Sequence, residues 1–371
     1  MEPIIIVGAG LTGAVIAERC ANVLNKRVIV IEKRPHVAGN CYDFVDENEI
    51  IVSKYGAHIF HTSDEEVWQY LQKFAEWQPY EHRVLSKVNG KLVIIPVNID
   101  TVNSLLELHL KSSKDMEEWL QSQRSQTTNF VNSEEVALSR LGSKKLYELM
   151  FKNYTYKQWS LWPSELEPSV LSRIPVRFNK NDRYFNDTYE AMPKKGYTDL
   201  IEHMLANPLI EVRLNTDYFD VKASIPKQST IFYTGPIDRY FNNKFDKLQY
   251  RSLRFEFETI NKDSYQEAAV INYPSLDVPF TRIVEYKKLY ESKSDKSVIS
   301  REYPTWDGEP FYPVPTKQNR DLYEKYQYEA TLVPSTVFAG RLANYKYYNM
   351  DQAVKNALHV YYSWHMHGTH K

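Results

Sequence analysis

The feature that most constrains the fold is a glycine-rich turn directly after the first apolar run of the chain. Residues 4–7 read IIIV, which predicts a short buried parallel strand. Gly8, Gly10 and Gly13 follow with the spacing G-x-G-x-x-G. In this pattern the first glycine permits the tight turn, the second lets the backbone approach a pyrophosphate, and the third lets a helix pack on the strand. Apolar residues then recur at helical spacing over residues 11–24, so a pyrophosphate would lie at a helix N-terminus.

A second strand and a terminal acid complete this dinucleotide-binding unit. Residues 27–31 read RVIVI and are followed by Glu32, at the distance where an acid holds the ribose hydroxyls and repels the extra phosphate of NADP. Residues 33–43, KRPHVAGNCYD, resemble the FAD proteins of the glutathione-reductase-like group. Residues 335–345, STVFAGRLANY, predict a strand followed by Gly340 and Arg341, a segment that returns to the flavin in those proteins. The sequence therefore predicts FAD.

The remaining glycines restrict the class of flavin enzyme. None of the 12 glycines forms a second fingerprint, so the sequence indicates no site for a nicotinamide hydride donor. This argues against a reductase. It leaves a flavin oxidase, or a flavin enzyme with no net redox change.

Composition excludes several other classes of protein. The net charge of −1 favours neither nucleic acid nor an acidic membrane as a partner. Two cysteines make no disulfide framework and fit a reducing compartment. No apolar run approaches the roughly 20 residues of a membrane span, and the N-terminus lacks the basic region of a signal peptide, so we expect a cytoplasmic protein. Many of the 28 tyrosines lie beside Arg, Asn and Asp, which suits a polar pocket.

The coarse pattern predicts an α/β fold with α+β insertions. Helices are predicted over residues 64–80, 103–110, 116–120, 134–141 and 143–151, with Ser133 and Ser143 as caps. Asn89-Gly90 predicts a hairpin turn. Residues 250–260 alternate as a strand does. We expect a discontinuous Rossmann-like FAD domain (1–80, 191–244 and 316–371), a mainly helical domain (81–170), and an antiparallel-sheet substrate domain (171–190 and 245–315).

Several stretches that combine arginine and aromatic residues carry a family resemblance. They include KYGAHIFHT (54–62), YTYKQW (154–159), RIPVRF (173–178), TRIVEYK (281–287), FYPV (311–314) and GRLANYKYY (340–348). With these motifs the chain resembles bacterial UDP-galactopyranose mutase almost end to end. The resemblance implies a redox-neutral isomerisation of UDP-galactopyranose to UDP-galactofuranose by covalent catalysis through N5 of reduced FAD. It also implies a homodimer, an external reductant of unknown identity (NAD(P)H, or a reduced flavin or ferredoxin source), and a role in lipopolysaccharide or capsule biosynthesis.

The resemblance also implies roles for individual residues. The catalytic residues would be Arg173, Arg282 and His58. The substrate would contact Tyr154, Trp159, Arg173, Tyr184, Asn272, Arg282, Tyr312, Tyr347 and Asn349. The cofactor would contact Gly8, Gly10, Thr12, Gly13, Glu32, Lys33, Arg34, Gly39, Asn40, His58, Gly340, Arg341 and Met350. Two arginines on the diphosphate would stabilise UDP as it departs. No metal is expected, because no carboxylate or cysteine completes a site with His58 and His61.

The chain departs from the family pattern at three positions, and other functions stay open. Asn349 stands where the family has aspartate, Thr12 where relatives often have phenylalanine, and Ala38 where they often have glycine. The same mutase chemistry on UDP-N-acetylgalactosamine or dTDP-fucose is one alternative. An amine-oxidase-like flavin oxidoreductase is another, although an amine would not need an anion clamp. A third is a protein that binds FAD and a nucleotide sugar without turnover.

Overall fold

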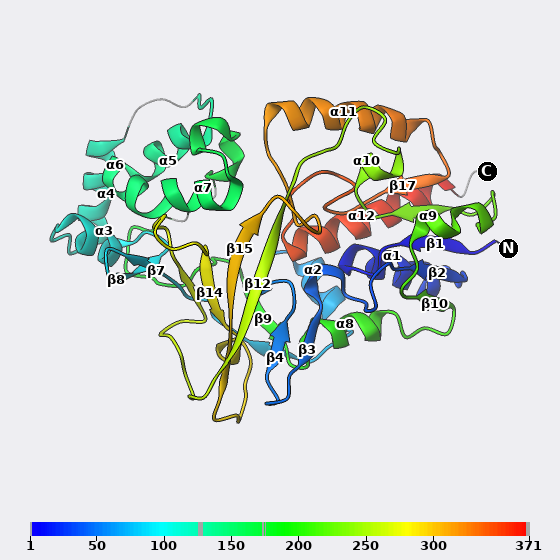
Figure 1. Ribbon diagram of the computed structural model, residues 1–371, viewed down its shortest axis with the longest axis horizontal. Coiled ribbons are helices and arrows are strands. Elements are labelled where there is room, and N and C mark those ends of the chain that lie inside the picture. The colour runs from blue at the N-terminus through cyan, green and yellow to red at the C-terminus, as the bar shows by residue number, and fades with distance from the viewer. Residues whose placement is uncertain (1, 125–128, 173, 175, 369–371) are drawn as a thin grey trace.

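The computed structural model describes residues 2–124, 129–172, 174 and 176–368 and has a mixed α/β architecture, as predicted. Figure 1 shows helices α3–α7 at one end of the molecule and β1, β2, α1 and α12 at the other, with the long strands β12 and β15 between them. Within the described residues, no helix combines the length and the apolar character that a membrane span needs. Arg173 lies outside the described residues.

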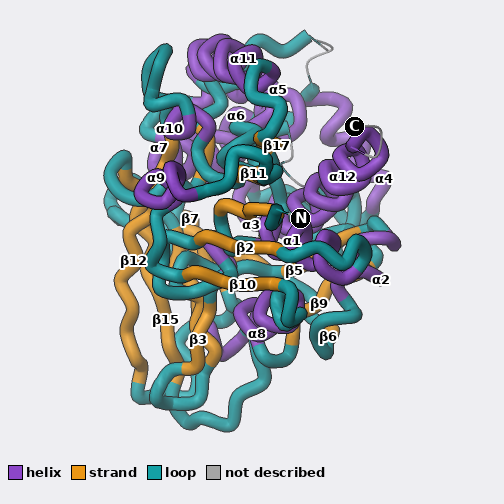
Figure 2. Tube along the Cα trace, turned by 90° about the vertical axis from the view of Figure 1, so that its right-hand side faces the viewer, coloured by secondary structure: helices purple, strands orange, loops and turns teal. Residues whose placement is uncertain are grey.

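A parallel sheet carries the predicted dinucleotide-binding unit. Its order is β10 (Ile210–Arg213), β2 (Val28–Ile31), β1 (Ile4–Val7), β11 (Ile231–Tyr233) and β17 (Thr336–Phe338), and neighbouring strands run parallel. Every residue of β1 and β2 is buried, as expected for strands covered on both faces. Helices α1 (Leu11–Asn22) and α12 (Met350–Gly368) contact each other and lie beside this sheet (Figure 2). The pairing of β17 with β11 confirms that the C-terminal segment returns to the N-terminal unit.

A seven-stranded sheet fills the middle of the molecule. Its order is β16 (Tyr312–Pro313), β12 (Tyr250–Ile260), β15 (Ser297–Thr305), β14 (Arg282–Glu285), β13 (Val270–Asn272), β7 (Val84–Val88) and β8 (Lys91–Ile95). All neighbours are antiparallel except β13 and β7. The predicted hairpin turn is confirmed, since Asn89 and Gly90 both have positive φ. We grouped this hairpin with the helical domain, whereas the structure pairs it with the sheet.

A small antiparallel sheet corrects one predicted helix. The helix predicted over residues 64–80 is α2 (Glu65–Leu71) only, and residues 77–79 form strand β6 (Trp77–Pro79). β6 and β5 (Phe60–Thr62) flank β9 (Tyr189–Pro193). The apolar spacing past residue 71 reflects this long-range pairing, which overrides the local helical pattern. β3 (Asp43–Val45) and β4 (Ile51–Ser53) form a separate hairpin.

The helical layer contains the other predicted helices with shifted bounds. They are α3 (Ile99–Leu106), α4 (Ser113–Gln123), α5 (Ser133–Leu141), α6 (Lys144–Leu146), a π-helical turn (Tyr147–Lys152) and α7 (Asn153–Trp159). Ser143 caps α6 as predicted, but the cap of α5 is Asn132 rather than Ser133. The predicted helix over 143–151 therefore continues through the π turn to Trp159. The remaining helices are α8 (Gly196–Met204), α9 (Tyr218–Val221), α10 (Ile237–Tyr240) and α11 (Lys317–Thr331).

The turn between β1 and α1 generates a stability prediction. A Cβ on Gly13 would lie 2.0 Å from the Gly8 carbonyl oxygen, whereas a Cβ on Gly10 would meet Gly39 Cα at an ordinary 3.7 Å. Gly13→Ala should therefore lower the free energy of unfolding by about 1–3 kcal/mol, and Gly10→Ala should leave it nearly unchanged. Urea denaturation of both variants without added dinucleotide measures this. Equal stability of the two would contradict the close helix–strand contact.

Candidate active site

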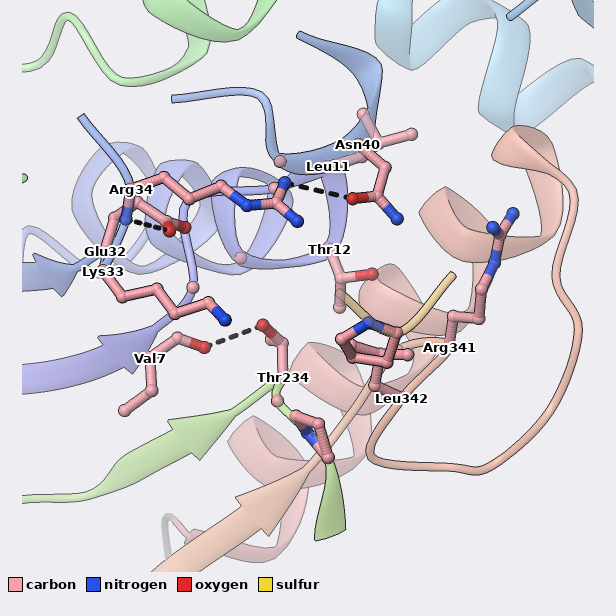
Figure 3. A pocket seen from close by; sticks show the side chains of 18 of the residues that line it. Val7, Leu11, Thr12, Glu32, Lys33, Arg34, Asn40, Thr234, Arg341 and Leu342 are labelled. Atoms are coloured by element: carbon pink, nitrogen blue, oxygen red, sulfur yellow. Dashed lines mark hydrogen bonds between the residues drawn. The ribbon is translucent and has the colours of Figure 1, made fainter. Parts of the chain in front are cut away.

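A cavity at the carboxyl ends of β1 and β2 brings together all of the predicted cofactor residues. Its walls include Gly8, Gly10, Thr12, Gly13, Glu32, Lys33, Arg34, Gly39, Asn40, His58, Gly340, Arg341 and Met350. Figure 3 shows Glu32, Lys33 and Arg34 at one side and Arg341 at the other. The position outside the carboxyl ends of parallel strands is where α/β sheets bind nucleotides.

The acid after β2 is held by backbone amides. One oxygen of the buried Glu32 accepts from Ala9 N at 2.8 Å, and the other accepts from Arg34 N at 2.9 Å. Arg34 donates to Asn40 Oδ1 at 3.0 Å (Figure 3). Its guanidinium also lies over the Tyr55 ring. The carboxylate therefore has a fixed orientation at the cavity, with lone pairs left for hydroxyl donors.

The N-terminus of α1 supplies donors for an anion. Its N-cap is Gly10, and no described side chain caps this helix or places an acid in its first turn. The free amide groups and the helix dipole therefore favour a phosphate there. Thr12 lies against the C-terminal segment, because a Cβ on Gly340 (φ +91°) would lie 2.9 Å from Thr12 Oγ1. Ala38, which stands where relatives often have glycine, has a left-handed φ of 69°. Glycine adopts this conformation more easily.

His58 lies in the cavity wall as a neutral imidazole. Burial and the nearby Arg341 lower the pKa of His58 to about 4, although its bond to Gly56 opposes that shift. The Nδ1–H donates to the Gly56 carbonyl at 2.8 Å, so Nε2 keeps a lone pair. His58 is therefore an acceptor, not a cation, at neutral pH.

The predicted catalytic Arg282 is fixed by an acid that sequence analysis missed. Arg282 Nε donates to Glu302 Oε2 at 2.6 Å, and the Glu302 side chain is 1% exposed. Burial alone would lower the pKa of Arg282, but Glu302, Tyr154 and Tyr312 hold it well above its usual range. The second oxygen of Glu302 is buried without a hydrogen-bond partner among the described residues. Residues 302–304 read EYP, and nothing in this local sequence singles out the glutamate.

The predicted substrate residues on α7, β16 and the segment before α12 gather around Arg282. Tyr154 and Tyr312 lie close enough to Arg282 to affect its pKa. The Tyr312 ring stacks on Tyr347 with a centroid separation of 5.6 Å and meets Trp159 edge-on at 6.4 Å. Arg341 Cζ lies 4.8 Å from the Tyr347 ring centroid, which joins this cluster to the cofactor cavity.

Tyr184 lies near the same cluster, on a loop whose backbone is bound by the buried side chain of Arg177. Tyr184 lies close enough to Tyr154 to affect its pKa. The Arg177 guanidinium donates to the Arg183, Tyr184 and Phe185 carbonyls and to Asn186 Oδ1. A rigid fork with five donors suits such a set of acceptors.

Two asparagines lie at different places in the site. Asn272 ends β13 directly opposite Arg282 in β14, and its Oδ1 is buried without a hydrogen-bond partner in the described part of the chain. Asn349 lines the cofactor cavity, and its backbone N–H donates to Gln352 Oε1 at 3.1 Å. The structure therefore places Asn272 with the arginine cluster and Asn349 at the cofactor wall.

His82 and Glu309 are further residues that sequence analysis did not find. His82 is 4% exposed, and its ring meets Tyr184 edge-on at 5.6 Å. Glu309 pairs with Lys33 at 2.7 Å and Arg34 at 3.4 Å across the rim of the cavity. Glu309 lies two residues before the FYPV motif, but its partners are distant in sequence. Among the described residues, no group of three or more His, Cys, Asp and Glu side chains is placed to hold a metal ion.

Comparisons with known proteins match nearly the whole chain. A family model described as UDP-galactopyranose mutase matches residues 149–347, and a model described as an NAD(P)-binding Rossmann-like domain matches residues 6–74. A probable UDP-galactopyranose mutase of Klebsiella pneumoniae is 40% identical, covering 96% of this chain and 92% of that protein. A dTDP-fucopyranose mutase of Escherichia coli is 37% identical, covering 96% and 97%. A solved structure of reduced UDP-galactopyranose mutase gives a TM-score of 0.79 at 17% identity, covering 100% and 96%, which shows the fold.

The buried His82 generates a prediction about pH. Burial, with Arg282 and His61 nearby, lowers the pKa of His82 to about 3, whereas the pKa of a histidine in an unfolded chain is about 6.5. Between these pH values the unfolded chain binds one more proton, so His82 removes up to about 1.4 kcal/mol of stability per pH unit as pH falls. His82→Gln should therefore flatten the dependence of unfolding free energy on pH between about 4.5 and 6.5.

Urea denaturation of wild type and variant across that range provides the measurement. His109→Gln, at an exposed position, is the control and should leave the slope unchanged. A slope in His82→Gln equal to that of the wild type would show that His82 is not held neutral.

Proposed function

The chain belongs to the UDP-galactopyranose mutase family, and on that premise we propose that it interconverts UDP-galactopyranose and UDP-galactofuranose without net redox change. The observation that carries the proposal is Arg282, held by Glu302 within a group of tyrosines. A fixed cation surrounded by phenol donors suits a diphosphate, which both sugars carry. Relatives named as this mutase, at 35–40% identity, support the same reaction class.

We propose FAD as the cofactor of the cavity beside Arg282. The uncapped N-terminus of α1 suits the pyrophosphate, and Glu32 suits the ribose. Thr12 and Gly340 lie close together in the wall of this cavity. When it is bound in its reduced form, FAD supplies the nucleophile, its N5 nitrogen. His58 Nε2 offers an acceptor at the cavity wall for an N–H or O–H group.

The tyrosines and Arg282 serve the departure and return of UDP. Burial raises the pKa of Tyr312 to about 12 and that of Tyr154 still higher. Both phenols therefore stay protonated at neutral pH and donate hydrogen bonds to phosphate oxygens. Negative charge grows on the diphosphate as the bond to the sugar breaks, so donors and a cation fixed in advance stabilise that step most. Arg173, by its motif, is proposed as a second cation.

A relative supports one alternative substrate. The dTDP-fucopyranose mutase, at 37% identity, lies between two UDP-galactopyranose mutases at 40% and 35% identity. The diphosphate clamp would serve dTDP-fucose, or UDP-N-acetylgalactosamine, equally well. We propose UDP-galactose as the first substrate and these two as the alternatives. An amine oxidase is disfavoured, because Arg282 would repel a cationic amine.

The wider setting is also part of the proposal. We propose a cytoplasmic homodimer, reduced by an external donor, whose product supplies galactofuranose for cell-surface polysaccharide. The three domains are proposed with the boundaries given above, except that the hairpin of β7 and β8 belongs with the sheet domain. Arg173, which the structure does not describe, completes the proposed catalytic set with Arg282 and His58.

The direct experiment is chromatography of UDP-galactofuranose incubated with the FAD-loaded protein, with and without dithionite. Conversion to UDP-galactopyranose only under reduction is the expected result. No conversion with FAD bound and reduced would contradict the proposed substrate. Parallel incubations with UDP-N-acetylgalactosamine and dTDP-fucose then separate another mutase from a protein without turnover.

Arg282→Ala should lower turnover at least about 10²-fold while FAD stays bound, because the fixed cation at the diphosphate is lost. The substitution leaves Glu302 as an unpaired buried charge, which costs about 3–5 kcal/mol of stability. The double variant Arg282→Ala/Glu302→Gln removes that charge and is the stability control. It should unfold like the wild type yet remain inactive in the chromatographic assay. Wild-type turnover in either variant would show that Arg282 is not part of the active site.

Asn349→Asp should keep kcat/KM within about tenfold of the wild type, because the two side chains have the same shape and Arg341, which lines the same cavity, supplies positive charge. Steady-state kinetics of the reduced enzyme measure this. Complete loss of activity would show that the pocket is built around an amide at this position.

A further inference from the structure

Lys157 makes an unusual set of contacts between the helical layer and the large sheet. It lies on α7, and its Nζ donates to the carbonyl oxygens of Tyr273 at 2.6 Å, Ser275 at 3.0 Å and Phe280 at 2.5 Å. All three ammonium protons are therefore used on one loop. No carboxylate is among these three partners, and burial lowers the pKa of Lys157 to about 8. Burying an ammonium group that is bound only by carbonyl oxygens costs free energy. A structural role for Lys157 would account for that cost.

The loop that Lys157 holds joins two proposed substrate residues. It runs from Asn272, the last residue of β13, to Arg282, the first residue of β14. These two residues are opposite each other in the antiparallel register. Tyr273 N donates to the Thr281 carbonyl at 2.8 Å and closes the base of the loop. A displacement of this loop would therefore move Asn272 and Arg282 together.

Lys157 itself lies between two other proposed substrate residues. Tyr154 and Trp159 are on the same helix, α7, so their positions follow that of Lys157. Tyr154 is close enough to Arg282 for each to affect the pKa of the other. A second cation fixes the end of α7, since Arg251 Nε on β12 donates to the Gln158 carbonyl at 2.9 Å.

We propose that Lys157 is a positioning residue that sets the distance between the two halves of the substrate clamp, Tyr154 and Trp159 on α7 and Asn272 and Arg282 on the sheet. It touches neither substrate nor cofactor and acts through the loop over residues 273–281. This role rests on the proposed function, because the clamp it sets is the proposed diphosphate site. Three charge-assisted hydrogen bonds on one loop are enough to fix its place relative to α7.

The test is calorimetric titration of UDP into FAD-loaded wild type and Lys157→Met. Methionine is one atom shorter than lysine but keeps an unbranched apolar stem and removes every donor, so UDP affinity should fall about tenfold or more. KM for the UDP-sugar should rise by the same factor, while the flavin absorption spectrum stays that of the wild type. Lys157→Arg, which restores charge and donors, should recover most of the affinity.

Thr101→Val is the matched structural control. Thr101 is 1% exposed and donates to the Ile94 carbonyl at 2.8 Å, so this variant also removes a buried bond between the helical layer and the sheet, away from the clamp. It should bind UDP within about twofold of the wild type. A comparable loss of affinity in Thr101→Val would reduce Lys157 to a general stabilising role and overturn the proposal.

The remaining outcomes separate this proposal from the function on which it rests. If the wild-type protein binds UDP and Lys157→Met binds it equally well, only the positioning role of Lys157 is overturned. If the wild-type protein does not bind UDP, the proposed function and the positioning role are both overturned. If Lys157→Met does not retain FAD, the titration is made with Lys157→Gln, and affinity within twofold of the wild type there overturns the role.

Discussion

The ion pair between Arg282 and Glu302 is the interaction on which the rest of the site depends. It crosses from β14 to β15 at 2.6 Å, with the glutamate almost completely removed from solvent. A buried pair of this kind contributes little to stability compared with apolar packing, and breaking it is costly. The ion pair fixes the position of the Arg282 guanidinium. The tyrosines from α7 and β16 are then arranged around a fixed charge.

Three separate parts of the chain must meet at that charge. The parallel sheet supplies a cavity suited to a dinucleotide, the large sheet supplies Arg282, and the helical layer supplies Tyr154 and Trp159. Between the large sheet and the helices, the contacts described for Lys157 and Arg251 are bonds from cations to carbonyls. Such contacts are directional, so they fix relative position more closely than apolar packing does.

The sequence predicted best those features whose signal is local. The turn at Gly8–Gly13 and the buried strands were predictable because spacing and apolar runs lie within a few residues. The helix expected over 64–80 was too long because β6 pairs with β9, more than 100 residues away in the chain. Glu302 and His82 were missed because each is defined by partners from distant strands. The motif containing Lys157 was visible, but its backbone carbonyl partners leave no trace in a sequence.

The most direct test of this account is a crystal structure of the reduced protein with FAD and UDP bound. The account places the pyrophosphate of FAD at the N-terminus of α1 and the diphosphate of UDP within hydrogen-bonding distance of Arg282, with Tyr154 and Tyr312 as neighbouring donors. A UDP diphosphate bound elsewhere, with Arg282 still paired only to Glu302, would contradict the claim that this ion pair organises the substrate site.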